Sequence, residues 1–215
     1  MKKKLLMISV FTMLIFFVKA QNNWVLNTDN EGIKVYTRTL PNSKIKAIKI
    51  ETTIQATLSQ IVNVIFDIKS SSQWVYRTKN CSIIKQFSPW DVYYYAEVDV
   101  PWPVNHRDFI AHLTLSQNQM SKIIVVNVEN KPDLLPQKHN LIRVMQSAGK
   151  WVITPTTEHT INVEYSLFTD PGGNMPAWLI NMFITKGPLE SFKKLKEQIK
   201  NPIYSFISLT DIKEI

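Results

Sequence analysis

Apolar and polar side chains alternate along much of this chain, which predicts strands of a sheet with one buried face. The clearest case is residues 160–168, where the even positions are largely polar and the odd positions are Ile161, Val163, Tyr165 and Leu167. The runs Ile33–Leu40 and Ile45–Ile54 also alternate, and the turn residues after Pro41 predict that they pair antiparallel. Further runs, together typical of an antiparallel meander, are Ser82–Phe87, Val92–Val100, Phe109–Ser116, Ile123–Glu129, Ile142–Ser147 and Trp151–Thr156.

Two segments change to helical spacing. Residues Ala56–Ile68 place apolar side chains three and four positions apart, and Thr57 is a suitable N-cap. After a turn at Gly172-Gly173, Pro176 suits a first helical turn, and residues 177–184 are apolar on almost every side. This order of elements predicts the α+β class, with a long C-terminal helix lying across the concave side of a curved antiparallel sheet.

Face parity identifies the side chains that would point toward that helix. Successive residues of a strand point to opposite faces, so every second residue of a run shares one face. On the two central runs the inner face would carry Tyr94, Ala96, Val98, Phe109, Ala111 and Leu113. The alanines leave space on this face, but alternation alone fits both a filled core and the wall of a cavity.

The N-terminus has the pattern of a targeting segment. Three lysines at positions 2–4 precede the apolar run Leu5–Val18, and small residues suitable for a signal peptidase end at Ala20. The apolar run is shorter than the roughly 20 residues that a membrane-spanning anchor needs. We therefore expect a signal peptide over residues 1–20 and a single domain over residues 21–215, exported to the periplasm or the extracellular space.

The charge of the chain lies largely in that segment. Removing residues 1–20 takes away four of the 25 basic residues and none of the 17 acidic ones, which lowers the net charge from +8 to +4. The remainder has no basic run interleaved with aromatic residues, so nucleic-acid binding is not expected. Because Cys81 is the single cysteine, no internal disulfide can form, and the exported domain must depend on its core.

The sequence shows no arrangement of residues typical of catalysis or metal binding. It has no nucleophile elbow, no phosphate-binding glycine loop and no dinucleotide fingerprint. Glu97 and Asp99 share a strand face, but parity directs them to solvent. The four histidines have no partners at metal-ligand spacing and are expected at the surface. We therefore expect no catalytic residue, no metal and no cofactor.

One charged pair lies in a setting that calls for a structural explanation. Arg107 and Asp108 follow the loop 99–104 and open an apolar strand. Buried charges are costly unless they are paired or hydrogen-bonded. We expect an ion pair or a clamp on the loop backbone, rather than a ligand contact.

The stretch Val100–Phe109 resembles the loop-and-strand pattern of START domains, the StAR-related lipid-transfer family, because Pro-Trp-Pro is followed three residues later by Arg-Asp-Phe. Three further segments agree in order and spacing over most of residues 24–199. They are Ile142-Arg143 with Gly149–Pro155, the Asp170–Gly173 turn after a strand, and Pro176–Asn181 followed by Gly187-Pro188. The resemblance implies a helix-grip fold with an elongated apolar cavity that takes one lipid or a similar molecule.

The chain departs from the sterol-binding members that it resembles. Those members place a buried arginine six residues after the motif arginine and pair it with an acid on the preceding strand. Here these positions are Leu113 and Tyr94. Recognition of a sterol hydroxyl by a charged pair is therefore not expected. With this difference in mind, we predict a lipid-binding lining of Tyr94, Val98, Phe109, Leu113, Tyr165, Trp178, Asn181 and Met182.

The first functional hypothesis is a non-enzymatic, monomeric carrier or sensor of a lipid or other hydrophobic small molecule, with transient contact at a membrane surface. The second hypothesis is a cyclase- or dehydratase-like enzyme on the same scaffold, which would need a titratable group inside the cavity. The third is an interaction module with a filled core. An empty volume beneath the last helix distinguishes the first two hypotheses from the third.

Overall fold

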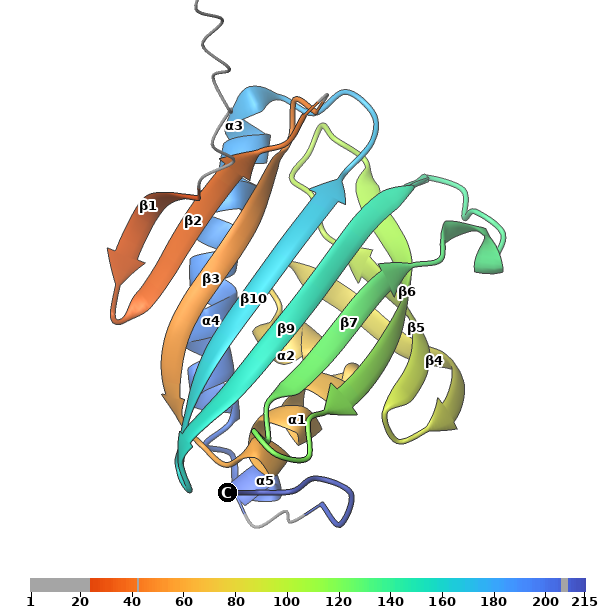
Figure 1. Ribbon diagram of the computed structural model, residues 1–215. Helices are drawn as coiled ribbons and strands as arrows, with labels where there is room; N and C mark the ends of the chain where they lie inside the picture. The colour runs from red at the N-terminus through yellow and green to blue at the C-terminus, as the bar shows by residue number, and fades with distance from the viewer. Residues whose placement is uncertain (1–23, 42, 206–208) are drawn as a thin grey trace, which may run out of the picture.

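One curved sheet forms the body of the molecule, and a long helix lies across its concave side (Figure 1). The computed structural model describes residues 24–41, 43–205 and 209–215, so the predicted signal peptide lies outside the described residues. In this part of the chain ten strands join in the spatial order β1-β2-β3-β10-β9-β7-β6-β5-β4, with β8 beside β6. Their bounds are β1 Val25–Asn30, β2 Ile33–Thr39, β3 Lys46–Gln55, β4 Thr78–Ser88, β5 Asp91–Val98, β6 His106–Gln117, β7 Ile124–Asn130, β8 Leu141–Arg143, β9 Gln146–Thr157 and β10 Thr160–Asp170.

The strand order confirms the predicted first hairpin and modifies the predicted meander. Strands β2 and β3 pair antiparallel, as the turn after Pro41 indicated. Strands β4 to β7 follow one another as neighbours, but β10 pairs with β3 as well as with β9. The last strand therefore lies in the middle of the sheet, and the C-terminal helix starts from there.

The prediction of a single strand over Ile142–Ser147 is wrong. Strand β8 ends at Arg143 and pairs parallel with β6, where the Val144 amide donates a hydrogen bond to the Asp108 carbonyl (2.9 Å). Strand β9 begins at Gln146 and pairs with β10 instead. The apolar content of the sequence does not show that the chain changes its pairing partner between β8 and β9. Strand β1 was not predicted either, because it is exposed at the sheet edge and has no buried alternation.

The two segments with helical spacing form helices, whereas two short helices were not predicted. Helix α1 (Leu58–Phe66) begins at Thr57, which forms a capping box with Gln60. Its chain continues through η1 (Ile68–Ser70) into the short α2 (Ser71–Trp74). At the C-terminus, α3 (Ala177–Asn181), the π-helical turn η3 (Met182–Lys186) and α4 (Gly187–Gln198) follow without a break, and α5 (Pro202–Ser205) comes after them. The described residues contain no helix long and apolar enough to cross a membrane.

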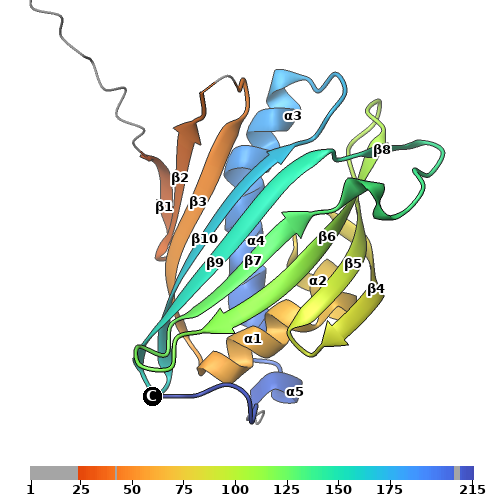
Figure 2. The same ribbon diagram turned by 45° about the vertical axis from the view of Figure 1, so that its right-hand side comes forward.

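The hydrophobic core lies between the sheet and the helices, and Figure 2 shows α1, α2 and α4 on the same side of the sheet. Helix α1 turns its fully buried residues Ile61 and Val62 toward the sheet. Helix α4 does the same with Phe192 and Leu195. Some core residues, such as Trp74 and Phe192, also line the cavity described below, so the core and the cavity adjoin each other.

A buried ion pair fixes the outer face of β6. The Asp108 carboxylate is fully buried and accepts two hydrogen bonds from Arg143, at 2.9 Å from Nε and 3.0 Å from Nη2. The remaining Arg143 donors reach the carbonyls of Pro132, Leu135 and Pro136. The ion pair thus ties the loop between β7 and β8 to the sheet. The expected ion pair is thus present at Asp108, and its partner is Arg143, which lies on β8.

We expect Asp108→Ala to destabilise the fold by about 3–5 kcal/mol, because it leaves the buried Arg143 guanidinium without its carboxylate. Urea unfolding of a protein that comprises residues 21–215, followed by tryptophan fluorescence, measures the change. The control is Glu129→Ala, which removes an exposed partner of Lys131 and should cost at most about 1 kcal/mol. Equal losses in the free energy of unfolding would show that the buried ion pair stabilises the fold no more than the exposed one.

Candidate functional site: a cavity under the C-terminal helix

A cavity of about 320 Å³ lies between the sheet and the C-terminal helix. Strands β3 to β10 supply its walls except for β8, α2 and the following segment close one side, and η3 and α4 cover it. Most of the lining is aliphatic or aromatic, and the small residues Ala96 and Ala111 are part of it, as face parity predicted. The volume lies within the range of cavities that bind small molecules.

Five of the eight residues predicted to contact a lipid line this cavity. They come from strands β5, β6 and β10, whose inner faces point to the helix, and they are Tyr94, Val98, Phe109, Leu113 and Tyr165. Because Tyr94 and Leu113 occupy the positions where the sterol-binding pattern has a charged pair, the wall of the cavity is uncharged there. These positions agree with the predicted geometry, while the binding role of each residue stays a prediction.

The other three predicted contacts, Trp178, Asn181 and Met182, are not part of the cavity lining. Trp178 is 53% exposed and Asn181 is exposed as well. The prediction was wrong because the segment is apolar on nearly every side, so the sequence does not show which side faces inward. The helical residues that do line the cavity recur every three or four positions, namely Ile180, Phe183, Ile184, Gly187, Pro188, Ser191 and Phe192.

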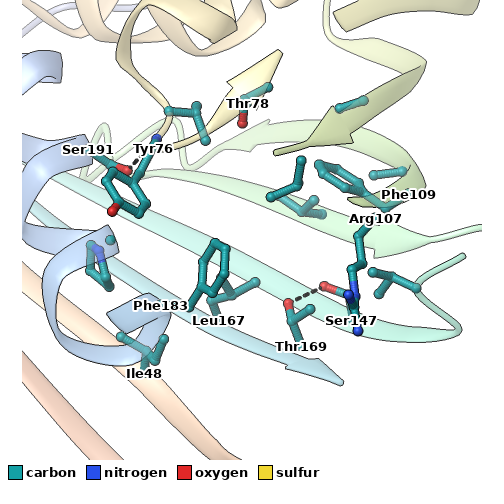
Figure 3. Close-up of a pocket in the computed structure, with 18 of the residues that line it drawn as sticks. Ile48, Tyr76, Thr78, Arg107, Phe109, Ser147, Leu167, Thr169, Phe183 and Ser191 are labelled. Atoms are coloured by element: carbon teal, nitrogen blue, oxygen red, sulfur yellow. Dashed lines mark hydrogen bonds between the residues drawn. The ribbon is translucent and has the colours of Figure 1, made fainter. Parts of the chain in front are cut away.

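Arg107 closes one end of the cavity (Figure 3). Its side chain is 2% exposed and donates hydrogen bonds to the carbonyls of Asn105, Pro171 and Gly172, the last at 2.8 Å. Burial lowers the pKa of this guanidinium, and no carboxylate pairs with it in the described part of the chain. The expectation of a backbone clamp is therefore correct, and the clamp joins β6 to the turn that precedes the C-terminal helix.

The same end carries two hydroxyl groups, and an aromatic cluster lies deeper. Ser147 and Thr169 bond to each other across β9 and β10 (2.8 Å), close to Arg107 in Figure 3. The indole of Trp151 stacks on the rings of both Tyr165 (4.3 Å between centroids) and Phe192 (5.5 Å), which also contact each other (6.1 Å). The cavity therefore has a polar end and an apolar end, an arrangement that suits an amphipathic molecule.

Three titratable groups of the cavity lining, Cys81, Tyr94 and Tyr165, are held in their neutral forms. Burial raises the pKa of the Cys81 thiol to about 11 and also raises the pKa of Tyr94 and of Tyr165. None of these groups can act as a base at neutral pH without a partner that lowers its pKa. They can donate hydrogen bonds.

The groups that the sequence suggested for other chemistry lie outside the cavity. Glu97 accepts hydrogen bonds from Tyr95 (2.7 Å) and Lys138 (2.8 Å), which lower its pKa to about 2. Asp99 pairs with Arg77 and Lys79. All four histidines are absent from the lining, and the described residues contain no group of three potential metal ligands.

Several residues that line the cavity were not predicted from the sequence. Asn130, Ser147 and Thr169 are polar members of the lining, and Trp74 contributes its ring from α2. Their local sequences carry no sign of this role, since each depends on strand register. The inner face of the helix is different. Its residues can be found in the sequence by counting back in steps of three and four from Phe192, a buried residue of the amphipathic α4.

Comparison with known proteins agrees with this geometry. The family model described as START domain matches residues 18–202, so the chain belongs to the START family. It is 30% identical to a STAR-related lipid transfer protein of Xanthomonas axonopodis, whose crystal structure superposes with a TM-score of 0.76, covering 82% of this chain and 98% of that one. Human STARD10, at 18% identity and a TM-score of 0.71, shares the fold; 86% of this chain and 77% of that one are covered.

Two relatives found by sequence cover similar parts of the chain. An uncharacterized protein of Pseudomonas aeruginosa is 32% identical over 174 residues, which cover 81% of this chain and 85% of the relative. The phosphatidylcholine transfer protein of Rattus norvegicus is 27% identical over 184 residues, which cover 83% of each chain. Together with the family match, these relatives support lipid binding and transport as the activity of this class of protein.

We expect Arg107→Ala to lower the free energy of unfolding by about 3 kcal/mol or more, since three loop carbonyls lose a charged donor. Urea unfolding measures this, and Arg107→Lys should recover part of the stability because an ammonium can satisfy some of the carbonyls. An Arg107→Ala variant with wild-type stability but without ligand binding would contradict the clamp assignment.

Proposed function

We propose that this protein is a non-enzymatic carrier or sensor that binds one lipid or similar hydrophobic molecule in the cavity beneath η3 and α4. The observation that carries the proposal is the empty, mostly apolar volume between the sheet and the helix. Removing a hydrocarbon chain from water gains about 0.8 kcal/mol per CH₂ group, so apolar area alone can provide affinity. The phosphatidylcholine transfer proteins among the relatives make a phospholipid a reasonable first ligand to test.

The polar end of the cavity supports a particular orientation. The buried Arg107 guanidinium uses three of its five N–H groups on loop carbonyls, which leaves two for a ligand. A polar head would lie near Arg107, and an apolar tail would run toward Trp151 and Phe192. The enzyme hypothesis has less support, because the raised pKa values of Cys81, Tyr94 and Tyr165 favour neutral groups that do not exchange protons at pH 7.

We propose that the lipid leaves and enters at a membrane surface through the end of the molecule that carries α3. Trp178 on α3 and Trp102 in the loop between β5 and β6 are 53% and 90% exposed, and Figure 2 shows both elements at this end. Indole rings prefer the interface between lipid and water. Lys44 and Lys46, exposed in and after the β2–β3 turn, would face anionic headgroups. On α4, by contrast, Lys193 is bound to Glu31.

Export and a monomeric state are also proposals. The lysines at positions 2–4, the apolar run Leu5–Val18 and the small residues that end at Ala20 support secretion, with residue 21 as the first mature residue. A cavity built from one sheet and one helix of a single chain needs no second copy to be complete. In this proposal the protein binds its lipid in the periplasm or outside the cell.

Filling the cavity should abolish lipid binding. Ala111 is 2% exposed on the inner face of β6, so Ala111→Trp would occupy the ligand's volume at a cost of about 1–3 kcal/mol in stability. Native mass spectrometry of the mature protein after incubation with a total lipid extract measures binding. The matched control is Thr114→Trp, which adds the same ring to the outer face of the strand. A wild-type protein that retains no lipid would refute the proposed function.

Removing the exposed indoles should slow lipid exchange without weakening binding. We expect the double variant Trp102→Ala, Trp178→Ala to partition about tenfold less onto vesicles of mixed neutral and anionic phospholipid, since two apolar side chains no longer enter the interface. Vesicle sedimentation measures partitioning. The control is Met120→Ala, which removes another exposed apolar side chain (93%) from the β6–β7 loop at the other end. Equal partitioning of all three proteins would exclude this docking surface.

A further inference from the structure

Two tyrosine hydroxyl groups on the cavity wall have no hydrogen-bond partner. Tyr94 on β5 packs its ring against Phe109, and Tyr165 on β10 packs its ring against Trp151. Neither hydroxyl makes a hydrogen bond to any described residue, and both side chains are half-buried in the cavity wall. A phenylalanine would make the same ring contacts at either position.

Two tyrosines that are more completely buried, Tyr95 and Tyr204, behave differently. The Tyr95 hydroxyl donates to Glu97 (2.7 Å), and the Tyr204 hydroxyl donates to Asp67 (2.7 Å). Buried tyrosine hydroxyls usually have such a partner, because an unpaired polar group away from water costs free energy. The contrast indicates that the partner of Tyr94 and Tyr165 is a molecule in the cavity.

The backbone provides space for these hydroxyl groups. A Cβ atom at Gly149 of β9 would lie 3.2 Å from the Tyr165 hydroxyl oxygen and 3.2 Å from Val128, so only glycine leaves the phenol where it is. On the other side, Tyr94 is in register with Ala111, whose methyl group leaves room above the sheet. Asn130 of β7 is in register with Ala111 and continues the same row of side chains across the sheet. Its Oδ1 is buried without a donor among the described residues.

The part of the cavity beside the Tyr94 and Tyr165 hydroxyl groups has no charged residue in its described lining. Arg107 is in register with Val98, four residues along β5 from Tyr94, which corresponds to about 13 Å along a strand. The other charged lining residue among those described, Lys46, is exposed at the rim. An anion beside Tyr94 and Tyr165 would be buried without a cation, which is costly. An uncharged oxygen atom fits two neutral O–H donors.

We propose that the ligand carries a hydroxyl or carbonyl oxygen within its apolar body, and that the Tyr94 and Tyr165 hydroxyl groups hydrogen-bond to it. This inference rests on the proposed function and narrows it, because an unsubstituted hydrocarbon chain would leave both hydroxyl groups unpaired. Tyr94 and Tyr165 are then specificity residues, which select among hydrophobic molecules by the position of one polar atom.

A positional series of ligands tests the inference. Octadecanoic acid and its monohydroxy isomers, with the hydroxyl group at successive positions along the chain, share one headgroup and one length. Competition with a fluorescent fatty acid measures their affinities for the mature protein. We expect a subset of neighbouring isomers to bind about fivefold more tightly than octadecanoic acid, the gain of a net hydrogen bond.

The double variant Tyr94→Phe, Tyr165→Phe removes the two oxygen atoms and keeps the rings. It should bind all isomers equally and bind octadecanoic acid at least as well as the wild type. Its thermal stability should equal or exceed that of the wild type, since no hydrogen bond to a described residue is lost. Tyr95→Phe is the matched control, because it loses a hydrogen bond on the outer face and should keep the isomer preference.

The outcomes separate this inference from the proposed function. If the wild type binds octadecanoic acid but shows no preference within the series, or if the double variant keeps the preference, the inference is wrong and the proposed function stands. If the wild type binds neither these acids nor any component of a lipid extract, both are wrong. A preference that disappears only in the tyrosine double variant supports the inference.

Discussion

The cavity depends on how two adjacent residues of β6 use opposite faces of the sheet. Asp108 points outward to Arg143 and secures the loop between β7 and β8, while Arg107 points inward and holds the carbonyls of Pro171 and Gly172. Because neighbouring side chains of a strand lie on opposite faces, one strand can fasten loops on both sides at the same level. The inward clamp fixes the turn from which α3, η3 and α4 extend across the sheet.

With the helix held in this way, the size of side chains decides which part of the concave face is filled. Large residues such as Trp151 and Phe192 meet at one end and form the core with α1. Ala96 of β5 and Ala111 of β6 are part of the cavity wall. A packed interior and a cavity thus share one continuous apolar surface, and the small residues mark the change between them.

The sequence predicted the inner faces of the strands better than it predicted the helix. Period-2 alternation assigns a face to each strand residue without reference to a partner, so Tyr94, Val98, Phe109, Leu113 and Tyr165 were placed correctly. In the segment 177–184 nearly every side is apolar, and the assignment of Trp178, Asn181 and Met182 failed. The partnership of Asp108 with Arg143, 35 residues apart, follows from the parallel pairing of β8 with β6, which no local pattern contains.

The distribution of polar atoms in the cavity bears on how such a protein distinguishes ligands. A cavity lined by hydrocarbon alone gains similar free energy from any chain that fits, so it discriminates mainly by volume. Here a cationic end at Arg107 and a neutral level at Tyr94 and Tyr165 are separated along the strands. Under the proposed recognition, a ligand that matches both levels leaves no donor unpaired, and the cost of an unpaired buried donor exceeds the gain from a hydrogen bond. In the absence of a charged pair at Leu113 and Tyr94, the spacing of polar atoms along the ligand would replace charge as the basis of selection.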